Sequence, residues 1–239
     1  MNWISARARH QPTVVVSIST LEILRSRRRF PKSQHIYLPV TMRRYEGRRS
    51  GSTGTNSYVL VVGNFNQWRN AEGLLSVAQE IVAQGAESEV RIRLISDRGI
   101  HPSLLPFLNS SFLDYRMPGG SLEEGYLHAW GALVPALRVT GMKTTILQAW
   151  SYGCPVICSA ASASTVDYPS AVAIGRDARA MVQLLRTLNG DRDRKDRLVN
   201  AGFNALETTF NPDHQDAQIR QLVSDVAQSK GVTQHGFDS

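Results

Sequence analysis

The chain has 239 residues, of which 42% are apolar and 20% are charged, and its formal net charge is +7. This length and apolar fraction suffice for a substantial buried core, in one large or two smaller domains, and they exclude a mostly disordered or fibrous chain. No apolar stretch reaches the roughly 20 residues of a membrane-spanning helix, and the basic N-terminal segment lacks the apolar stretch of a signal peptide. We therefore expect a cytoplasmic protein.

The positive charge is concentrated in the N-terminal segment. Residues 1–49 hold eleven Arg and Lys against two Glu, a net charge of +9, so the other 190 residues carry −2. A basic segment joined to a near-neutral body is typical of proteins that meet an anionic surface, either phospholipid headgroups or a nucleic acid. The same composition is also consistent with a solvated basic face that has no partner.

The first predicted elements form a short strand–helix–strand unit. The β-branched run at 13–19 predicts a buried strand, residues 20–30 predict a short helix, and residues 35–40 predict a second strand. Residues 43–57 are rich in Gly, Ser and Arg, which is typical of a linker.

From residue 58 onward, short apolar strands alternate with helices. The predicted strands are 58–63, 91–96, 112–117, 131–136, 155–159 and 171–175. The predicted helices are 71–84, 121–129, 144–152, 177–188, 191–208 and 213–229, and a polar loop is predicted at 64–70. Because parallel neighbours need a crossover connection, this alternation predicts a doubly wound α/β domain whose parallel sheet is covered on both faces.

Cys154 lies directly before the strand predicted at 155–159, and Cys158 lies within it. Their spacing places both side chains on the same side of the strand. A metal site would need further ligands close by, and disulfides are rare in the cytosol. We interpret both as buried thiols.

A loop followed by a helix N-terminus, in the sequence GMKTTILQAW, is the strongest candidate for a ligand site. Gly141 allows close backbone approach, the free amides of the first turn attract an anion, and Lys143 adds a positive charge. Gln148, one turn further along, could reach a hydroxyl group of the same ligand. The alternative is that Thr144 or Thr145 only caps the helix.

This loop and helix resemble the donor-site signature of the GT-B group 1 glycosyltransferases. The resemblance rests on Gly-x-Lys, Leu-Gln-Ala and Tyr-Gly-x-Pro-Val-Ile, which here form GMKTTILQAWSYGCPVI. The stretch VLVVGNFNQWRNAEGLL resembles the first strand and loop of their C-terminal domain, and ALVPA resembles the strand before the signature. The likeness covers residues 58–210 and implies a Rossmann-like, donor-nucleotide-binding domain, preceded by residues 1–57 and followed by a C-terminal helix and tail at 211–239.

The resemblance also implies roles for particular residues. Those expected at the donor diphosphate are Arg69, Gly141, Lys143, Thr144 and Thr145, and Gln148 is expected at the ribose. Gly63 and Asn64 are expected in the first loop. Arg116, Met117 and Pro118 are expected near the nucleobase. Arg69, Gln148 and Arg116 could alternatively be surface side chains that touch no ligand.

Three positions depart from the family pattern. Asn70 stands where a Lys usually follows the Arg, and Thr140 stands where the family has the first Glu of its E-x7-E pattern. Gln148 replaces the second Glu, so it can accept a hydrogen bond but without the assistance of a charge. We expect Lys143 to restore positive charge near the phosphates.

The activity implied by the resemblance is transfer of a sugar from a nucleotide diphosphate sugar to an acceptor, in polysaccharide or glycolipid synthesis. No cofactor beyond this donor is expected. No metal is expected either, since no Asp-x-Asp motif with flanking aliphatic residues occurs. The catalytic residues are not identified by the sequence.

GT-B enzymes have a second Rossmann-like domain for the acceptor, and residues 1–57 are too few to form one. We interpret them as a remnant of that domain followed by a basic linker. Three explanations fit: the sequence is a fragment, its start is misassigned, or it is one half of a split enzyme. A separate acceptor-domain polypeptide or a homodimer would then cover the apolar strand at 13–19. The basic residues at 25–49 would suit a peripheral enzyme at the cytoplasmic face of a membrane.

Three alternatives stay open. The chain could be a catalytically silent nucleotide-sugar-binding subunit, which the departures at Asn70 and Thr140 favour. It could be a sugar-nucleotide epimerase, which shares the GT-B architecture. A nucleic-acid binder is disfavoured, because the Arg-rich segment lacks interleaved aromatic residues.

Overall fold

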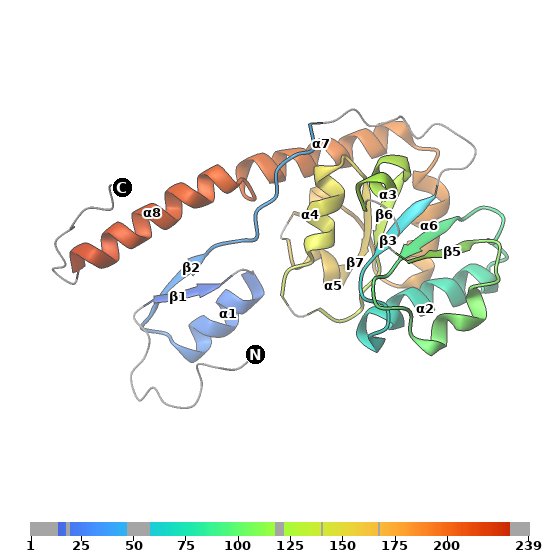
Figure 1. Ribbon diagram of the computed structural model, residues 1–239, viewed down its shortest axis with the longest axis horizontal. Helices are drawn as coiled ribbons and strands as arrows, with labels where there is room; N and C mark the ends of the chain where they lie inside the picture. The colour runs from blue at the N-terminus through green and yellow to red at the C-terminus, as the bar shows by residue number, and fades with distance from the viewer. Residues whose placement is uncertain are drawn as a thin grey trace.

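The main body of the protein is one parallel sheet with helices on both faces (Figure 1). The computed structural model describes residues 14–17, 20–46, 58–117, 122–139, 141–166 and 168–229. The six strands are β3 (Val59–Val62), β4 (Ile92–Ile95), β5 (Leu113–Arg116), β6 (Gly131–Val134), β7 (Val156–Ser159) and β8 (Ala173–Gly175). All neighbouring pairs are parallel, which confirms the doubly wound α/β fold predicted from the sequence.

The central strands β3, β6 and β7 are apolar on both sides because each side is covered. In β3, Val59 and Val61 face one core and Leu60 faces the other, and all three are buried. The first core is closed by α2 (Trp68–Ala83), the 3-10 helix η1 (Pro102–Phe107) and α6 (Ala178–Leu188). The second is closed mainly by α3 (Leu122–His128), α4 (Thr144–Ser151) and α7 (Arg192–Thr208). Cys154 and Cys158 lie in this second core, as expected of buried thiols.

The strand order creates a crevice at one end of the sheet. The order is β5-β4-β3-β6-β7-β8, so the chain runs outward from β3 to one edge and then returns to β6, on the other side of β3. In open parallel sheets, ligands bind beyond the carboxyl ends of the strands at such a reversal. The loops after β3 and β6 are therefore the place to look for a site.

A second, smaller sheet precedes the main body. It consists of β1 (Val14–Ser17) and β2 (Gln34–Tyr37), which pair in parallel and are joined by α1 (Thr20–Arg29). The His35 ring ties this unit together, since it lies 2.9 Å from the Ser26 hydroxyl and 2.9 Å from the Phe30 carbonyl. The predicted strand–helix–strand unit is thus confirmed, although β2 ends at Tyr37 and not at residue 40.

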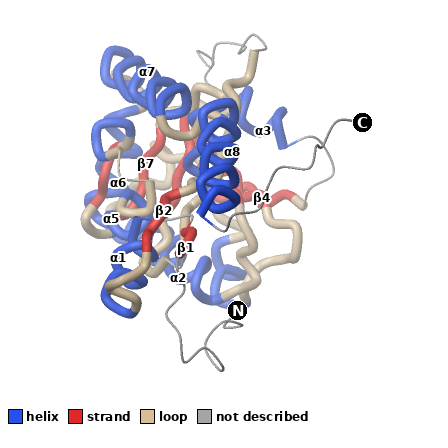
Figure 2. Tube along the Cα trace, turned by 90° about the vertical axis from the view of Figure 1, so that its left-hand side faces the viewer, coloured by secondary structure: helices blue, strands red, loops and turns tan. Residues whose placement is uncertain are grey.

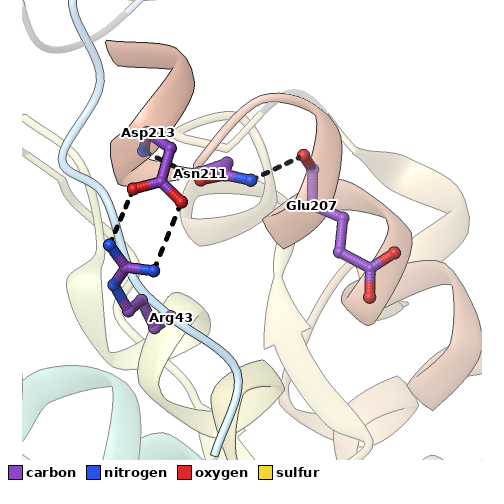
Figure 3. A network of polar contacts seen from close by, with 4 residues as sticks. All are labelled: Arg43, Glu207, Asn211 and Asp213. Carbon is purple, nitrogen blue, oxygen red and sulfur yellow. Dashed lines mark hydrogen bonds and ion pairs between the residues drawn. The ribbon is translucent and has the colours of Figure 1, made fainter. Parts of the chain in front are cut away.

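The start of the predicted linker is held against the main body. The Tyr45 amide donates to the Ser151 carbonyl at 3.0 Å, and the Ser151 hydroxyl donates to the Arg43 carbonyl at 2.6 Å. The Arg43 guanidinium also reaches both carboxylate oxygens of Asp213, at 2.7 and 3.3 Å (Figure 3). Residues 43–46 therefore form an ordered strap, and residues 47–57 lie outside the described residues.

The last helix, α8 (Pro212–Ser229), extends away from the main body, and it faces the viewer in the turned view (Figures 1 and 2). It begins directly after Asn211, where the sequence predicts a break between two helices. Its side chains Ile219 and Val223 are exposed. Among the described helices, none combines the length and the apolar character needed to cross a lipid bilayer.

The structure differs from the predicted elements at the start of α2 and in three additional short helices. Helix α2 begins at Trp68, so Arg69 and Asn70 lie in its first turn and not in a loop. The 3-10 helix η1, the short α5 (Ala160–Ala163) and the 3-10 helix η2 (Pro169–Ala171) were not predicted. Each of these three has six residues or fewer, too short for a helical periodicity to develop.

Candidate functional site

Two cavities open at the carboxyl ends of the strands. The smaller, of about 210 Å³, lies between the ends of β3 and β6 and the first turn of α4. The larger, of about 800 Å³, is a groove that runs from the end of β3 over β4 and β5 to α3. Both are lined by Val62 and Gly63, so they meet at the loop after β3.

The small cavity brings together three of the predicted diphosphate residues and one of the first loop. Lys143, Thr144 and Thr145 line it, together with Gly63 of that loop and with Asn70. The other lining residues are apolar and come from β3, β6 and the loops that follow them: Val62, Phe65, Leu133, Val134, Pro135, Ala136 and Met142. The site is therefore a narrow recess with an apolar wall and a polar, cationic mouth.

The N-terminus of α4 carries no side-chain cap. Its capping residue is Lys143, whose side chain makes no capping hydrogen bond. The idea that Thr144 or Thr145 caps the helix is therefore wrong. The backbone amides of the first turn are not satisfied by a capping side chain, and together with the helix dipole they favour an anion.

Two cations face this helix end. Arg69 lies in the first turn of α2, and its charge acts on the Lys143 ammonium group. Burial lowers the pKa of Lys143 below its ordinary value of 10.5, and the nearby Arg69 lowers it further. Lys143 lines the small cavity and Arg69 lies close enough to act on its charge, so the two together favour a ligand that carries at least two negative charges.

The loop after β3 is fixed from both sides. The Asn70 amide group donates to the Asn64 carbonyl at 2.8 Å, and the Phe65 amide donates to the Ser96 hydroxyl at 3.1 Å. The Asn64 Oδ1 atom is buried and has no hydrogen-bond partner among the described residues. Asn64 also lines the groove, so a ligand there would lie next to this side chain.

Three predicted residues line neither cavity: Arg69, Gly141 and Gln148. Gly141 has a φ of 74°, a left-handed conformation for which glycine is suited, so it shapes the loop before α4. Gln148 Oε1 accepts a long hydrogen bond, of 3.4 Å, from the hydroxyl of Tyr126, and burial raises the pKa of that hydroxyl. Thr140 lies outside the described residues.

The predicted nucleobase region lies at the groove. Arg116 and Met117 line it, and Pro118 lies outside the described residues. Arg116 is not a lone surface charge, because its guanidinium lies 2.8 Å from one oxygen of Asp114, whose other oxygen lies 3.0 Å from Arg93. One carboxylate thus holds two guanidinium groups on the face of the sheet.

Two residues that line this groove, Tyr58 and Arg93, were not predicted as site residues. The Arg93 guanidinium stacks 3.9 Å above the ring of Tyr58, and both side chains line the groove together with Asp97 and His128. The available signal was the charged residue inside the strand RIRLIS, since an Arg between buried apolar residues indicates a strand face that is not fully covered.

The sequence matches the profile of the family described as "Glycosyl transferases group 1" over residues 56–191. A search of curated proteins found no match. Solved structures with a similar fold include sucrose-phosphate synthase from Thermosynechococcus elongatus, with a TM-score of 0.70 and 15% identity over 90% of this chain and 59% of that one.

Two further solved structures are similar in fold. A TarM mutant from S. aureus, in complex with fondaparinux, alpha-GlcNAc-glycerol and UDP, has a TM-score of 0.73 and 8% identity over 88% of this chain and 43% of that one. The GtfA/B complex has a TM-score of 0.66 and 13% identity over 90% of this chain and 46% of that one. The chain spans about half the length of these three structures.

Proposed function

The chain belongs to the group 1 glycosyltransferases, and we propose that it forms the donor-binding part of an enzyme that transfers a sugar from a nucleotide diphosphate sugar to an acceptor hydroxyl. One observation carries the proposal. The uncapped N-terminus of α4, with Lys143 and the nearby Arg69, lies at a cavity where the strand order reverses. This is the place and the charge that a bound diphosphate requires.

The proposed chemistry is electrostatic. When the sugar leaves, negative charge develops on the diphosphate, and the first-turn amides of α4 and the Lys143 ammonium group would stabilise it. Arg69 adds positive charge from the first turn of α2. These groups are fixed before the reaction, so they need no reorganisation as the charge develops.

The groove offers room for the nucleoside. The Asn64 side chain lines the groove, where it would form a hydrogen bond with a ribose hydroxyl, and the base would lie near Arg116 and Met117. Gln148 is a weaker candidate for the ribose than the sequence suggested, because it lines neither cavity. Donor recognition would then rest on Asn64 more than on Gln148.

We further propose that a second α/β body supplies the acceptor site, either in a longer chain or in another polypeptide. The two-stranded parallel sheet of β1 and β2 supports this proposal, because parallel strands are normally buried in larger sheets. The GtfA/B structure is an example of an assembly in a protein of similar fold. A peripheral membrane location and a role in polysaccharide or glycolipid synthesis are supported by the basic residues 25–49.

Loss of either cation should weaken nucleotide binding. Replacing Lys143 by Ala should cost about 1.5–3 kcal/mol of binding free energy for the preferred nucleoside diphosphate, the range for a hydrogen bond to a charged group. Arg69→Ala should cost the same or less, since Arg69 does not line the cavity. Calorimetric titration with UDP, GDP and ADP would measure both effects.

The matched control for this titration is Lys195→Ala, which removes a Lys on α7 whose ammonium group donates to the Asn189 carbonyl at 2.7 Å. Its affinity should equal that of the parent chain. Equal affinity in the parent and in Lys143→Ala would contradict the placement of the diphosphate.

Nucleotide binding should also depend on pH through Lys143. Its pKa in the free protein lies below 10.5, so the amine loses its proton at a lower pH than an ordinary Lys, and affinity for a diphosphate should fall as the pH rises through that pKa. The free energy of unfolding should rise as the pH increases from that pKa to 10.5, because over this interval the Lys143 amine is protonated in the unfolded chain but not in the folded one. In Lys143→Arg the charge persists, so the fall in affinity should disappear. Identical pH profiles in the parent and Lys143→Arg would count against this account.

The function itself is tested by incubating the chain with UDP-, GDP- and ADP-sugars, with and without an acceptor, and analysing the products. Release of the sugar or its transfer, lost in Lys143→Ala, would support the proposal. Tight binding without any turnover would favour the silent binding subunit, and a changed sugar without an acceptor would indicate an epimerase.

A further inference from the structure

Three buried hydroxyl side chains lie directly behind the small cavity. They are Ser159 at the end of β7, Ser162 in α5 and Thr165 in the turn that follows. None of them lines the cavity. All three form hydrogen bonds that lead to the loop between β6 and α4, which ends at Lys143.

The first end of this loop is held by two hydroxyls. The Ala136 carbonyl accepts from Ser159 Oγ at 2.5 Å and from Ser162 Oγ at 3.3 Å. Ala136 lines the cavity, so these bonds fix part of its wall from behind.

The second end is held by Thr165. Its Oγ1 atom accepts from the Lys143 amide at 3.1 Å and donates to the Ser162 carbonyl at 2.8 Å. The single proton of this hydroxyl is used by the bond to Ser162, so a lone pair is directed at the Lys143 amide. The bond sets the position of the residue that caps α4 and carries the ammonium group of the site.

The opposite side of the loop packs on α2 without a gap. A Cβ atom built on Gly73 would lie 2.0 Å from the Pro135 carbonyl oxygen, so the backbones of α2 and of this loop are in direct contact. The Pro135–Ala136 segment is therefore held between Gly73 and the Ser159 and Ser162 hydroxyls. This arrangement sets the position of the N-terminal turn of α2, which carries Arg69, relative to the N-terminal turn of α4.

The hydroxyls are not needed to fill space. Apolar residues of similar size would pack in the same volume without the cost of burying polar groups. Only the bond from the Ser162 amide to Ser159 Oγ caps α5 itself. Three other bonds, from the Lys143 amide to Thr165 and from Ser159 and Ser162 to the Ala136 carbonyl, reach across 22 or more residues to the loop of the site.

We propose that Ser159, Ser162 and Thr165 are positioning residues, which hold the Lys143 backbone and the first turn of α4 in the geometry that binds the donor diphosphate. The inference rests on the proposed function. It assigns a role to a part of the chain, residues 159–165, outside the loop-and-helix signature at 141–157.

The test replaces Thr165 by Val, which keeps the shape but leaves the Lys143 amide without its acceptor. Affinity for the tightest-binding of UDP, GDP and ADP should fall about tenfold, the effect of one hydrogen bond lost from a buried pair. Thr165→Ser restores the hydroxyl and should restore the affinity. The control is Thr187→Val on α6, where the hydroxyl donates only to the Gln183 carbonyl of the same helix.

Titrations are made well below the melting temperature of each variant, so that loss of folded protein does not imitate loss of affinity. If Thr165→Val does not fold, Ser162→Ala takes its place, with the same expected direction. A folded variant with parental affinity would overturn the positioning role. A loss of affinity in Lys143→Ala would in that case leave the proposed function intact. If none of the three nucleotides binds the parent, the proposed function falls and this inference falls with it.

Discussion

Replacing Trp150 by Ala should lower the free energy of unfolding by about 3–5 kcal/mol. The indole is fully buried in the core under α4, with ring centroids 6.2 Å from Phe210 and 6.4 Å from Tyr168. Its Nε1 atom donates to the Ala171 carbonyl at 3.0 Å, and Ala would leave that buried carbonyl unpaired. Gly202 of α7 packs on the ring so closely that a Cβ atom there would lie 2.5 Å from it. The cavity left behind could not close without moving α7.

Urea denaturation of Trp150→Ala measures this loss through the midpoint and the slope of the transition. The matched control is Trp68→Ala on α2, whose side chain is 47% exposed, so its effect should be well below that of Trp150→Ala. A similar loss in both variants would show that Trp150 is not the anchor between α4 and α7.

Replacing Gly73 by Ala should destabilise the chain by about 1–3 kcal/mol or more and should also weaken nucleotide binding. The added methyl group would meet the Pro135 carbonyl oxygen at 2.0 Å and the Pro135 carbonyl carbon at 2.7 Å, and both are backbone atoms. Helix α2 must then move away from the loop after β6. This movement would carry Arg69 away from Lys143 and open the small cavity.

The control for Gly73→Ala is Gly190→Ala, because a Cβ atom on Gly190 would meet nothing within 4 Å. Replacing a Gly whose conformation suits Ala is neutral or stabilising. Thermal or chemical unfolding gives the stability, and nucleotide titration of the folded variants gives the affinity. Parental stability in Gly73→Ala would contradict the close contact between α2 and this loop.

The fold could be predicted from the sequence because it depends on local patterns. The β-branched runs that became β3 and β7 are apolar on both faces, which is typical of buried parallel strands. Helix boundaries were predicted well where a capping residue or a proline marks them. Asp177 caps α6 by accepting from the Ala180 amide at 2.7 Å, and Pro212 opens α8.

The site could be predicted only in part because its geometry depends on contacts between distant residues. The cationic loop and the helix end were visible in GMKTTILQAW, and the structure places Lys143, Thr144 and Thr145 at one cavity. The partner of Gln148 was not visible, because Tyr126 lies 22 residues away. The bond from Thr165 to Lys143 is equally distant in sequence, so no local pattern indicates it.

The linker shows the same limit of local patterns. Its Gly, Ser and Arg content predicted a linker, yet Arg43 pairs with Asp213, which lies 170 residues away. The pair is mostly exposed and contributes little to stability by itself, while the part-buried bond from the Ser151 hydroxyl to the Arg43 carbonyl is better shielded from water.

Binding of a diphosphate at the first turn of α4 is tested most directly by the change in backbone amide chemical shifts when the preferred nucleoside diphosphate is added to the ¹⁵N-labelled chain. We expect the amides of Lys143, Thr144 and Thr145 to shift most, that of Gly63 to shift less, and that of Gly190 not to shift. Shifts that leave the α4 turn unchanged while the nucleotide binds elsewhere would contradict it.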